Sequence, residues 1–198
     1  MEDVFRTIKD VSEGAYTEKR SRFLSFALPV RNAEEVKERV RQYRKKYYDA
    51  HHVCWAYMLG ATRDTFRVND DGEPSSTAGK PILGQINANR LTNILVIVVR
   101  YFGGIELGTS GLIVAYRSAA AAAITNATLE ECTINEDITV VFEFPSLNSI
   151  MRVVKEEQPE IVTQTFEMTC KMTLRIRKSR LEQLVARLKK YEKIFVCY

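Results

Sequence analysis

The stretch ILVIVVRYFGG, residues 94–104, decides the fold of the first part of this chain. Its six leading apolar residues predict a strand that is buried on both faces, as in the middle of a sheet covered by helices. Gly103 and Gly104 predict a tight turn after this strand. The alanine-rich residues 119–123 predict a helix that packs closely on the sheet, with Thr109 or Ser110 as its N-cap.

Toward the N-terminus, the sequence predicts further strands and helices. Residues 22–30 mix apolar and polar side chains as a strand does, and residues 52–59 are apolar on both faces. Asn32 is placed to cap a helix over residues 33–47. The remaining expected elements are a short strand at 65–68 and a helix at 82–89.

After about Glu131 the composition changes, and the elements follow the order β-α-β-β-α-β that is typical of ferredoxin-like domains. Each helix carries one apolar stripe behind a serine that is placed to cap it. We therefore predict an α+β protein of two domains, residues 1–131 and 132–198. The second domain is expected to have strands at 134–144, 160–166, 169–176 and 194–197 and helices at 146–157 and 179–191.

Composition excludes several classes of protein. The 198 residues are 45% hydrophobic, enough for packed cores, and the net charge of +4 is mild for a dedicated nucleic-acid binder. The charged start lacks a secretory signal and no apolar run is long enough to span a bilayer, so we expect a cytoplasmic protein without a membrane partner. The scattered cysteines match no disulfide or zinc pattern, so we expect reduced thiols and neither metal nor cofactor.

The loop at residues 69–81 contains three carboxylates, three hydroxyls and a lysine, together with two glycines, Gly72 and Gly79. Its amides and ammonium group suit a phosphate or carboxylate, whereas its acids suit a hard cation. Pro74 and Pro81 stand where a P-loop needs Gly and Ser or Thr, so a Walker-type ATPase is not expected. The competing interpretation is an Asp-Gly turn that leads into a helix. The candidate ligand-binding residues here are Asp71, Glu73, Ser75, Ser76, Thr77 and Lys80.

Further candidates lie at the end of the buried strand and at the start of the strand expected at residues 52–59. Arg100, with Gly103 and Gly104, can pair a guanidinium with backbone amides to receive an anion, although the spacing is not that of a dinucleotide-binding motif. Alternatively, the glycines serve only the turn. His51 and His52 are expected on opposite faces of a strand, so they do not share a metal, but His52 can face the loop as an acid, base or anion ligand, or be purely structural.

The last helix and the strand before it are rich in basic residues, which can contact phosphates or simply form a solvated face. The candidate nucleic-acid-binding residues are Arg175, Arg177, Lys178, Arg180, Arg187, Lys189 and Lys190.

The motifs HHVCWAY (residues 51–57), DGEPSSTAGKP (71–81) and VVRYFGGIELG (98–108) resemble those of the YigZ/IMPACT family. The resemblance implies an N-terminal ribosomal-protein/GHMP-kinase-like α/β sandwich domain and a C-terminal domain similar to domain V of elongation factor G. Eukaryotic members regulate translation through a co-activator of the amino-acid-starvation kinase, but the RWD domain of those members is absent from this sequence, so that partnership is not expected to transfer. The family motif has no established catalytic role, and its matching positions are His52, Asp71, Gly72, Glu73, Pro74, Thr77, Gly79, Lys80, Pro81, Arg100, Tyr101, Phe102, Gly103, Gly104 and Gly108.

Three functional hypotheses follow. The first is a translation-associated regulator that binds RNA or a ribosomal component without catalysis. The second is a small enzyme acting on a phosphorylated or nucleotide-like ligand at the two motifs. The third is a protein-binding module in which Tyr101 and Phe102 are exposed anchors. A preformed polar pocket at the motifs would favour a small ligand, whereas a flat, exposed basic surface would favour RNA.

Overall fold

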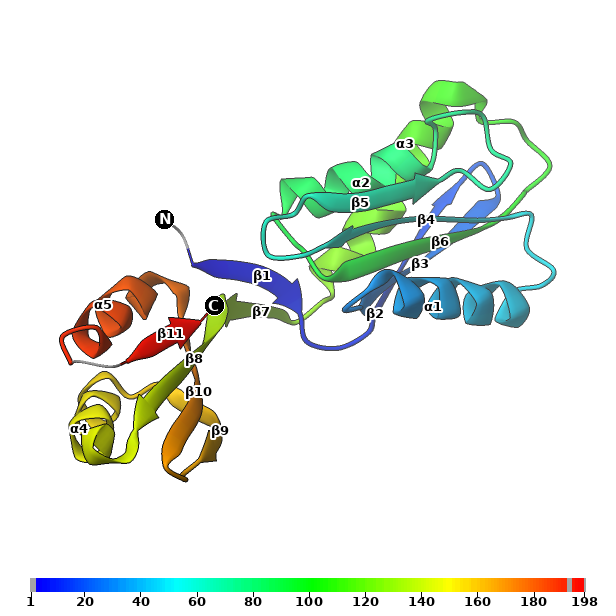
Figure 1. The fold of residues 1–198 in the computed structure, drawn as a ribbon. Helices are drawn as coiled ribbons and strands as arrows, with labels where there is room; N and C mark the ends of the chain where they lie inside the picture. Colours follow the sequence, from blue (N-terminus) through cyan, green and yellow to red (C-terminus); the bar gives the residue numbers. More distant parts are fainter. Residues whose placement is uncertain (1–2, 192–193, 198) are drawn as a thin grey trace. The chain divides into compact units, whose positions relative to one another are not determined.

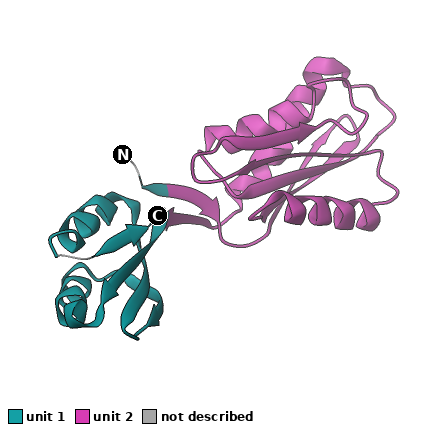
Figure 2. Ribbon diagram, in the orientation of Figure 1, with its two compact units in different colours: residues 1–4, 133–198 teal, residues 5–132 magenta. Residues whose placement is uncertain are grey.

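The computed structural model describes residues 3–191 and 194–197 and divides into two compact units (Figure 2). Unit 2 is Phe5–Cys132, and unit 1 combines Met1–Val4 with Thr133–Tyr198. The chain therefore passes from one unit to the other twice. None of the helices in the described ranges is long and apolar enough to cross a membrane.

Unit 2 is built on a five-stranded antiparallel sheet with the strand order β2-β3-β6-β4-β5. Helix α1 lies on one face of this sheet, and α2 and α3 lie on the other (Figure 1). The strands are β2 (Ser12–Glu18), β3 (Ser21–Pro29), β4 (His52–Leu59), β5 (Thr65–Asn69) and β6 (Ile94–Tyr101), and the helices are α1 (Ala33–Lys46), α2 (Gly79–Ala88) and α3 (Gly108–Thr125).

The central strand β6 confirms the prediction made from its apolar run, because all six residues from Ile94 to Val99 are completely buried. Alternate residues of the sheet enter two cores, one beneath α2 and α3 and the other beneath α1. The alanines of α3 allow a very close approach to β2. A Cβ atom added to Gly14 would lie 2.4 Å from the backbone nitrogen of Ala123.

The helix starts of unit 2 agree only in part with the starts predicted from the sequence. Asn32 caps α1 as predicted, since its Oδ1 accepts a hydrogen bond from the Glu35 amide at 2.9 Å. The predicted caps Thr109 and Ser110 are wrong, because α3 begins at Gly108 and both residues lie inside its first turn. The residue at the cap position is Leu107, whose side chain makes no capping hydrogen bond in the described structure. Helix α2 also starts earlier than expected, so residues 79–81 are helical and not part of the loop.

Three strands of polar or mixed sequence were not predicted. These are β1 (Val4–Ile8), β2 and β7 (Leu129–Thr133). Strands β1 and β7 form a two-stranded sheet of their own, and β2 is an edge strand of the large sheet. Edge strands bury little surface, so their apolar patterns are weak.

Unit 1 has the predicted element order β-α-β-β-α-β, in a four-stranded antiparallel sheet ordered β11-β8-β10-β9. Its core includes Phe142, Met172 and Leu184. The strands are β8 (Asn135–Glu143), β9 (Glu160–Thr165), β10 (Thr169–Arg177) and β11 (Phe195–Cys197), and the helices are α4 (Leu147–Glu157), after the 3-10 turn Phe144–Ser146, and α5 (Lys178–Leu188).

The predicted serine caps of unit 1 are wrong. Ser146 ends a 3-10 turn and makes no capping bond within the described residues, and Ser179 lies inside α5. The start of α5 is held instead by Asp3, whose Oδ2 accepts from the Ser179 amide at 3.2 Å and from Arg177 Nε at 2.6 Å. The hydrogen bond from Arg177 holds the pKa of the Asp3 carboxyl well below its usual range.

Candidate functional site

A pocket of about 480 Å³ opens in unit 2 where the start of β4, the end of β6, the loop before α2 and the start of α3 meet. These segments are distant in sequence, and the antiparallel register pairs His52 directly with Arg100. The lining residues are His51, His52, Glu73, Pro74, Arg100, Phe102, Glu106, Leu107, Gly108, Thr109 and Leu112.

A buried ion pair forms one wall of this pocket. Arg100 Nη1 donates to Glu73 Oε1 at 2.6 Å, and the side chains are only 8% and 3% exposed. The Tyr116 hydroxyl, from α3, donates to the same Glu73 oxygen at 2.7 Å. Because both donors converge on one carboxylate, Glu73 and Arg100 are held in fixed positions beside the pocket.

The guanidinium of Arg100 has one donor that is not used. Its Nε is buried and finds no hydrogen-bond acceptor among the described residues. The group lies between two aromatic rings, with Cζ 5.6 Å from the centroids of both Phe23 and Phe102. Leaving such a donor unpaired costs about 1–3 kcal/mol, and charged groups cost more. Arg100 Nε is thus an unsatisfied donor that is buried behind the wall of the pocket.

Both histidines line the pocket, contrary to the expectation that they would face opposite ways. The alternation does not apply because β4 begins at His52, so His51 precedes the strand. His52 Nδ1 donates to the Asp71 carbonyl oxygen at 2.7 Å, which leaves Nε2 3.9 Å from Glu73 Oε1. His51 Nδ1 accepts a hydrogen bond from the Phe102 amide at 3.2 Å.

The loop before α2 is organised by Asp70, which was not among the predicted ligand residues. Its carboxylate accepts hydrogen bonds from the amides of Ser76, Ala78 and Gly79 at 2.8–3.0 Å. Burial tends to raise the pKa of Asp70, but these three bonds outweigh it, so the pKa lies below its usual value. Asp70 is therefore a structural anion that shapes the loop.

Asp71 also has a structural position. Its Oδ2 accepts from the Val53 amide at 2.7 Å, and its Oδ1 pairs with Arg44 of α1. These contacts attach the loop to both β4 and α1, and Asp71 is not among the residues that line the pocket.

Of the predicted ligand residues, only His52, Glu73 and Arg100 are brought together at the pocket. Ser75 and Ser76 stay in the loop, the Thr77 hydroxyl donates to the Pro74 carbonyl oxygen at 2.6 Å, and Lys80 is exposed on α2. A Cβ atom on Gly103 would lie 2.1 Å from the Arg20 backbone, and Gly104 has a φ of +84°, so both glycines serve the chain path. The assignment of these six residues to a ligand site is not supported by their positions.

Sequence reasoning missed Tyr116 and Cys54, which lie behind the ion pair. Cys54 Sγ is 3.3 Å from the Tyr116 hydroxyl, and burial raises the pKa of both groups far above their usual values. Neither group is therefore an activated nucleophile. No sequence pattern indicated a role for Tyr116, because it is a single tyrosine within a largely apolar helix. Within the described ranges, no cluster of His, Cys, Asp and Glu side chains could hold a metal ion.

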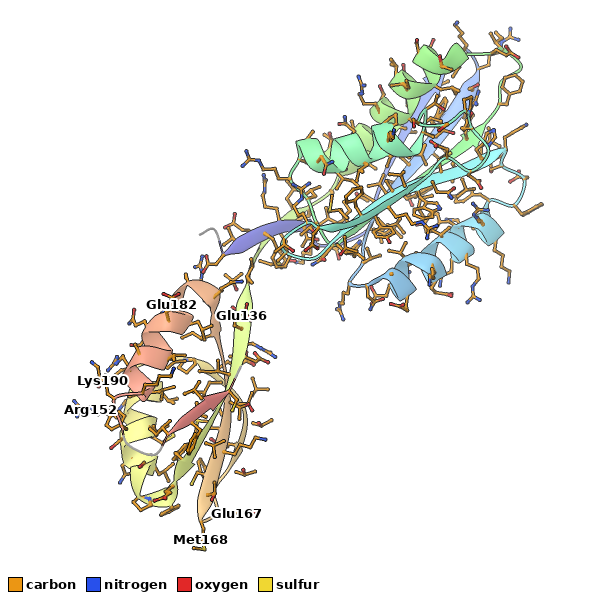
Figure 3. All side chains as sticks on the ribbon, turned by 45° about the horizontal axis from the view of Figure 1, so that its top comes forward. Glu136, Arg152, Glu167, Met168, Glu182 and Lys190 are labelled. Atoms are coloured by element: carbon orange, nitrogen blue, oxygen red, sulfur yellow. The ribbon has the colours of Figure 1, made fainter. Side chains whose placement is uncertain are left out.

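The basic residues predicted to bind nucleic acid are mostly engaged with carboxylates of unit 1. The buried Glu157 is contacted by Arg180 at 3.2 Å and by Arg187 at 2.5 Å. The other pairs are Arg175 with Asp137, Arg177 with Asp3 and Lys178 with Glu136. Lys189 and Lys190 are exposed beyond α5, where Figure 3 labels Lys190.

Comparison with known proteins identifies relatives over most of the chain. Residues 19–124 match the family model of the Impact N-terminal domain. IMPACT family member YigZ of Escherichia coli is 31% identical over 86% of this chain and 84% of its own length. IMPACT family member YvyE of Bacillus subtilis is 32% identical over 77% of this chain and 70% of its own.

A solved structure, described as the crystal structure of a hypothetical protein, has the same overall fold. It matches with a TM-score of 0.75 and 26% identity, over 99% of this chain and 97% of that one. With a family model over more than half of the chain and similarity to YigZ over most of it, this chain belongs to the IMPACT family.

Proposed function

We propose that this chain is a ligand-binding regulator whose pocket in unit 2 receives a small molecule with a phosphate or carboxylate group. The observation that carries the proposal is the presence of the Arg100 guanidinium and the His51 imidazole in the lining of one pocket. Both groups can donate hydrogen bonds to an anionic oxygen, and such charge-assisted bonds are the stronger ones. The pocket, of about 480 Å³, is large enough for a metabolite.

The start of α3 supports an anionic group on the ligand. Gly108 and Thr109 line the pocket, and the free amides at the start of this 18-residue helix favour negative charge. Glu73 does not repel such a group strongly, because Arg100 and Tyr116 already engage it. Phe102, Leu107 and Leu112 offer apolar contacts to the rest of the ligand.

Binding fits the pocket better than catalysis. The Cys54 thiol and Tyr116 hydroxyl remain protonated, since burial raises their pKa values. The enzyme hypothesis therefore lacks an activated nucleophile among these buried groups.

The test is a titration of the whole protein with phosphate, AMP, GMP and carboxylate metabolites, followed by NMR and calorimetry. We expect saturable shifts at His51, His52 and Thr109. Arg100→Lys keeps a cation beside Glu73 but removes the planar guanidinium and its several donors, so it should weaken binding. Lys80→Ala should leave binding unchanged, because Lys80 lies outside the pocket. Absence of saturable shifts with every compound would refute the proposal.

A second candidate is a contact with RNA or a ribosomal component in the regulation of translation. It is favoured by membership of the IMPACT family, which the motif resemblance associates with translation, and by the exposed Lys189 and Lys190. Binding to ribosomes and RNA across a salt series should weaken in a Lys189→Ala, Lys190→Ala variant if these lysines contact phosphates. A protein partner is the third candidate, since Phe102 is 41% exposed.

Three finer assignments belong to this proposal. We propose that units 2 and 1 correspond to the predicted domains, residues 1–131 and 132–198, with residues 3–4 added to the second. We also propose the ribosomal-protein/GHMP-kinase-like and ferredoxin-like fold names for them. The four free cysteines are consistent with a cytoplasmic location, which we propose as well.

A further inference from the structure

A second concave site lies on the other face of the sheet in unit 2, between α1 and strands β4 and β5. We call this space of about 330 Å³ the Trp55 groove. Its apolar side chains are Val36 and Val40 of α1 and Trp55 and Tyr57 of β4. The groove shares none of its lining residues with the pocket at Arg100.

The position of α1 explains why this part of the sheet stays open. Helix α1 packs toward β3, where Tyr43 and Tyr47 meet Phe26 with ring centroids 4.8 and 5.5 Å apart. The sheet extends beyond this contact to its edge strand β5. Because Arg67 of β5 pairs with Tyr57, both side chains lie on the same face.

Two aromatic rings lie parallel to each other in the groove. Trp55 and Tyr57 are two residues apart on one strand and so share a face. Their rings are stacked, with centroids 6.0 Å apart and planes that differ by 11°. Trp55 is half-buried, so part of its indole remains accessible. A planar ligand can stack on such a surface.

The charged residues that line the groove are all basic: Lys37, Arg41 and Arg44 of α1 and Arg67 of β5. Arg41 and Arg44 pair with Glu38 and Asp71, but their side chains remain 78% and 47% exposed. Exposed ion pairs of this kind are weak, so a phosphate can compete for the guanidinium groups. The groove thus combines a partly accessible indole with four basic side chains.

We propose that the Trp55 groove binds single-stranded nucleic acid, with one base against Trp55 and the neighbouring phosphates on Arg67 and Lys37. Aromatic side chains that stack bases beside a basic track are the general physical requirement for such binding. An acidic peptide would satisfy the cations but would not use the planar surface. The inference deepens the RNA candidate above, because it assigns binding to unit 2 instead of the lysines beyond α5.

The experiment uses the fluorescence of Trp55, which is the only tryptophan of the chain. The whole protein is titrated with an octanucleotide of uridine at several salt concentrations. Stacking of a base on the indole should quench the emission to saturation. Each phosphate contact should contribute about −0.7 to the slope of log K against log salt. Arg67→Ala should therefore make the slope less steep by about 0.7.

Two further variants test the stacking and the location. Binding is measured by the fluorescence anisotropy of labelled RNA. Trp55→Ala should lower the affinity roughly 5- to 100-fold, whereas Trp55→Phe should retain most of the wild-type affinity. Arg117→Ala is the matched control, because Arg117 is an exposed arginine on α3, across the sheet. The slope of log K against log salt for this variant should equal that of the wild type, apart from any loss of nonspecific attraction between the protein and RNA. Circular dichroism checks that each variant is folded.

Three results would overturn the inference. The first is saturable RNA binding without quenching and with the same salt slope in Arg67→Ala and in the wild type. The second is RNA binding that only the Lys189→Ala, Lys190→Ala variant weakens, which would leave the RNA candidate intact but exclude the groove. The third is quenching by an acidic leucine-containing peptide but not by RNA, which would make the groove a peptide site.

Discussion

The buried pair of Arg100 and Glu73 allows a quantitative prediction. Arg100→Met leaves the buried Glu73 with the Tyr116 hydroxyl as its hydrogen-bond donor and His52 Nε2 at 3.9 Å, and Glu73→Leu leaves the buried guanidinium without its carboxylate. Removing one member of a buried ion pair costs about 3–5 kcal/mol. Each single variant should therefore lower the free energy of unfolding of unit 2 by about that amount.

The double variant Arg100→Met, Glu73→Leu should recover most of this loss. Replacing a buried ion pair with apolar side chains is often neutral or stabilising. Here the Tyr116 hydroxyl loses its acceptor, which costs about 1–3 kcal/mol. We therefore expect the double variant to lose about 1–3 kcal/mol in total, and the two substitutions to be coupled by about 3 kcal/mol or more.

The assay is urea unfolding followed by Trp55 fluorescence, which reports on unit 2 because Trp55 lies in β4. The control is the exposed pair of Arg41 and Glu38 in α1, where Arg41→Ala should cost about 0.5 kcal/mol or less. The reasoning is refuted if the single variants cost less than about 1 kcal/mol, or if the double variant costs the sum of the two.

Three further predictions concern stability. Gly14→Ala should destabilise unit 2 by about 1–3 kcal/mol in the same urea assay, because the added Cβ meets the backbone of α3; an unchanged midpoint would contradict this close approach. The pKa of Asp70 in the folded protein lies below its ordinary value, so the ionised carboxylate stabilises the fold above the unfolded-state pKa. This stabilisation is lost as the pH falls through the folded-state pKa. The free energy of unfolding of the wild type should therefore decrease more than that of Asp70→Asn between about pH 4 and pH 2. Glu157→Ala should cost unit 1 about 1.5–3 kcal/mol by thermal unfolding, since Arg180 and Arg187 lose a carboxylate that is 1% exposed but remain partly solvated themselves; a shift no larger than that of Glu160→Ala would count against it.

The sequence predicted those elements whose apolar patterns are strong. Strand β6 was clear because it is buried on both faces, and α4 and α5 because each buries a single stripe of side chains. Strands β1 and β7 were missed because they are short, belong to a sheet of two strands and alternate weakly. The predicted cap at Ser179 was wrong because Asp3, 176 residues earlier, holds the start of α5.

The candidate site was also predicted only in part, because its contacts join residues that are distant in the sequence. Arg100 and Glu73 stood out locally, as a charge at the end of an apolar strand and an acid in a polar loop. Their contact depends on the sheet register and on Tyr116, which local sequence does not reveal. Lys80 and the loop hydroxyls looked equivalent to Glu73 in sequence, yet the carboxylate of Asp70 orders the loop so that only Glu73 and Pro74 line the pocket.

Because Asp3 belongs to unit 1, this protein cannot complete its folding in the order in which it is made. Residues 5–132 form a unit that is synthesised before Arg177, the residue that binds Asp3. At the usual rate of about 5–20 residues per second, the about 45 residues between them take roughly 2–9 s to translate. During this interval Asp3 has no Arg177 to bind, while unit 2 already has all of its sequence.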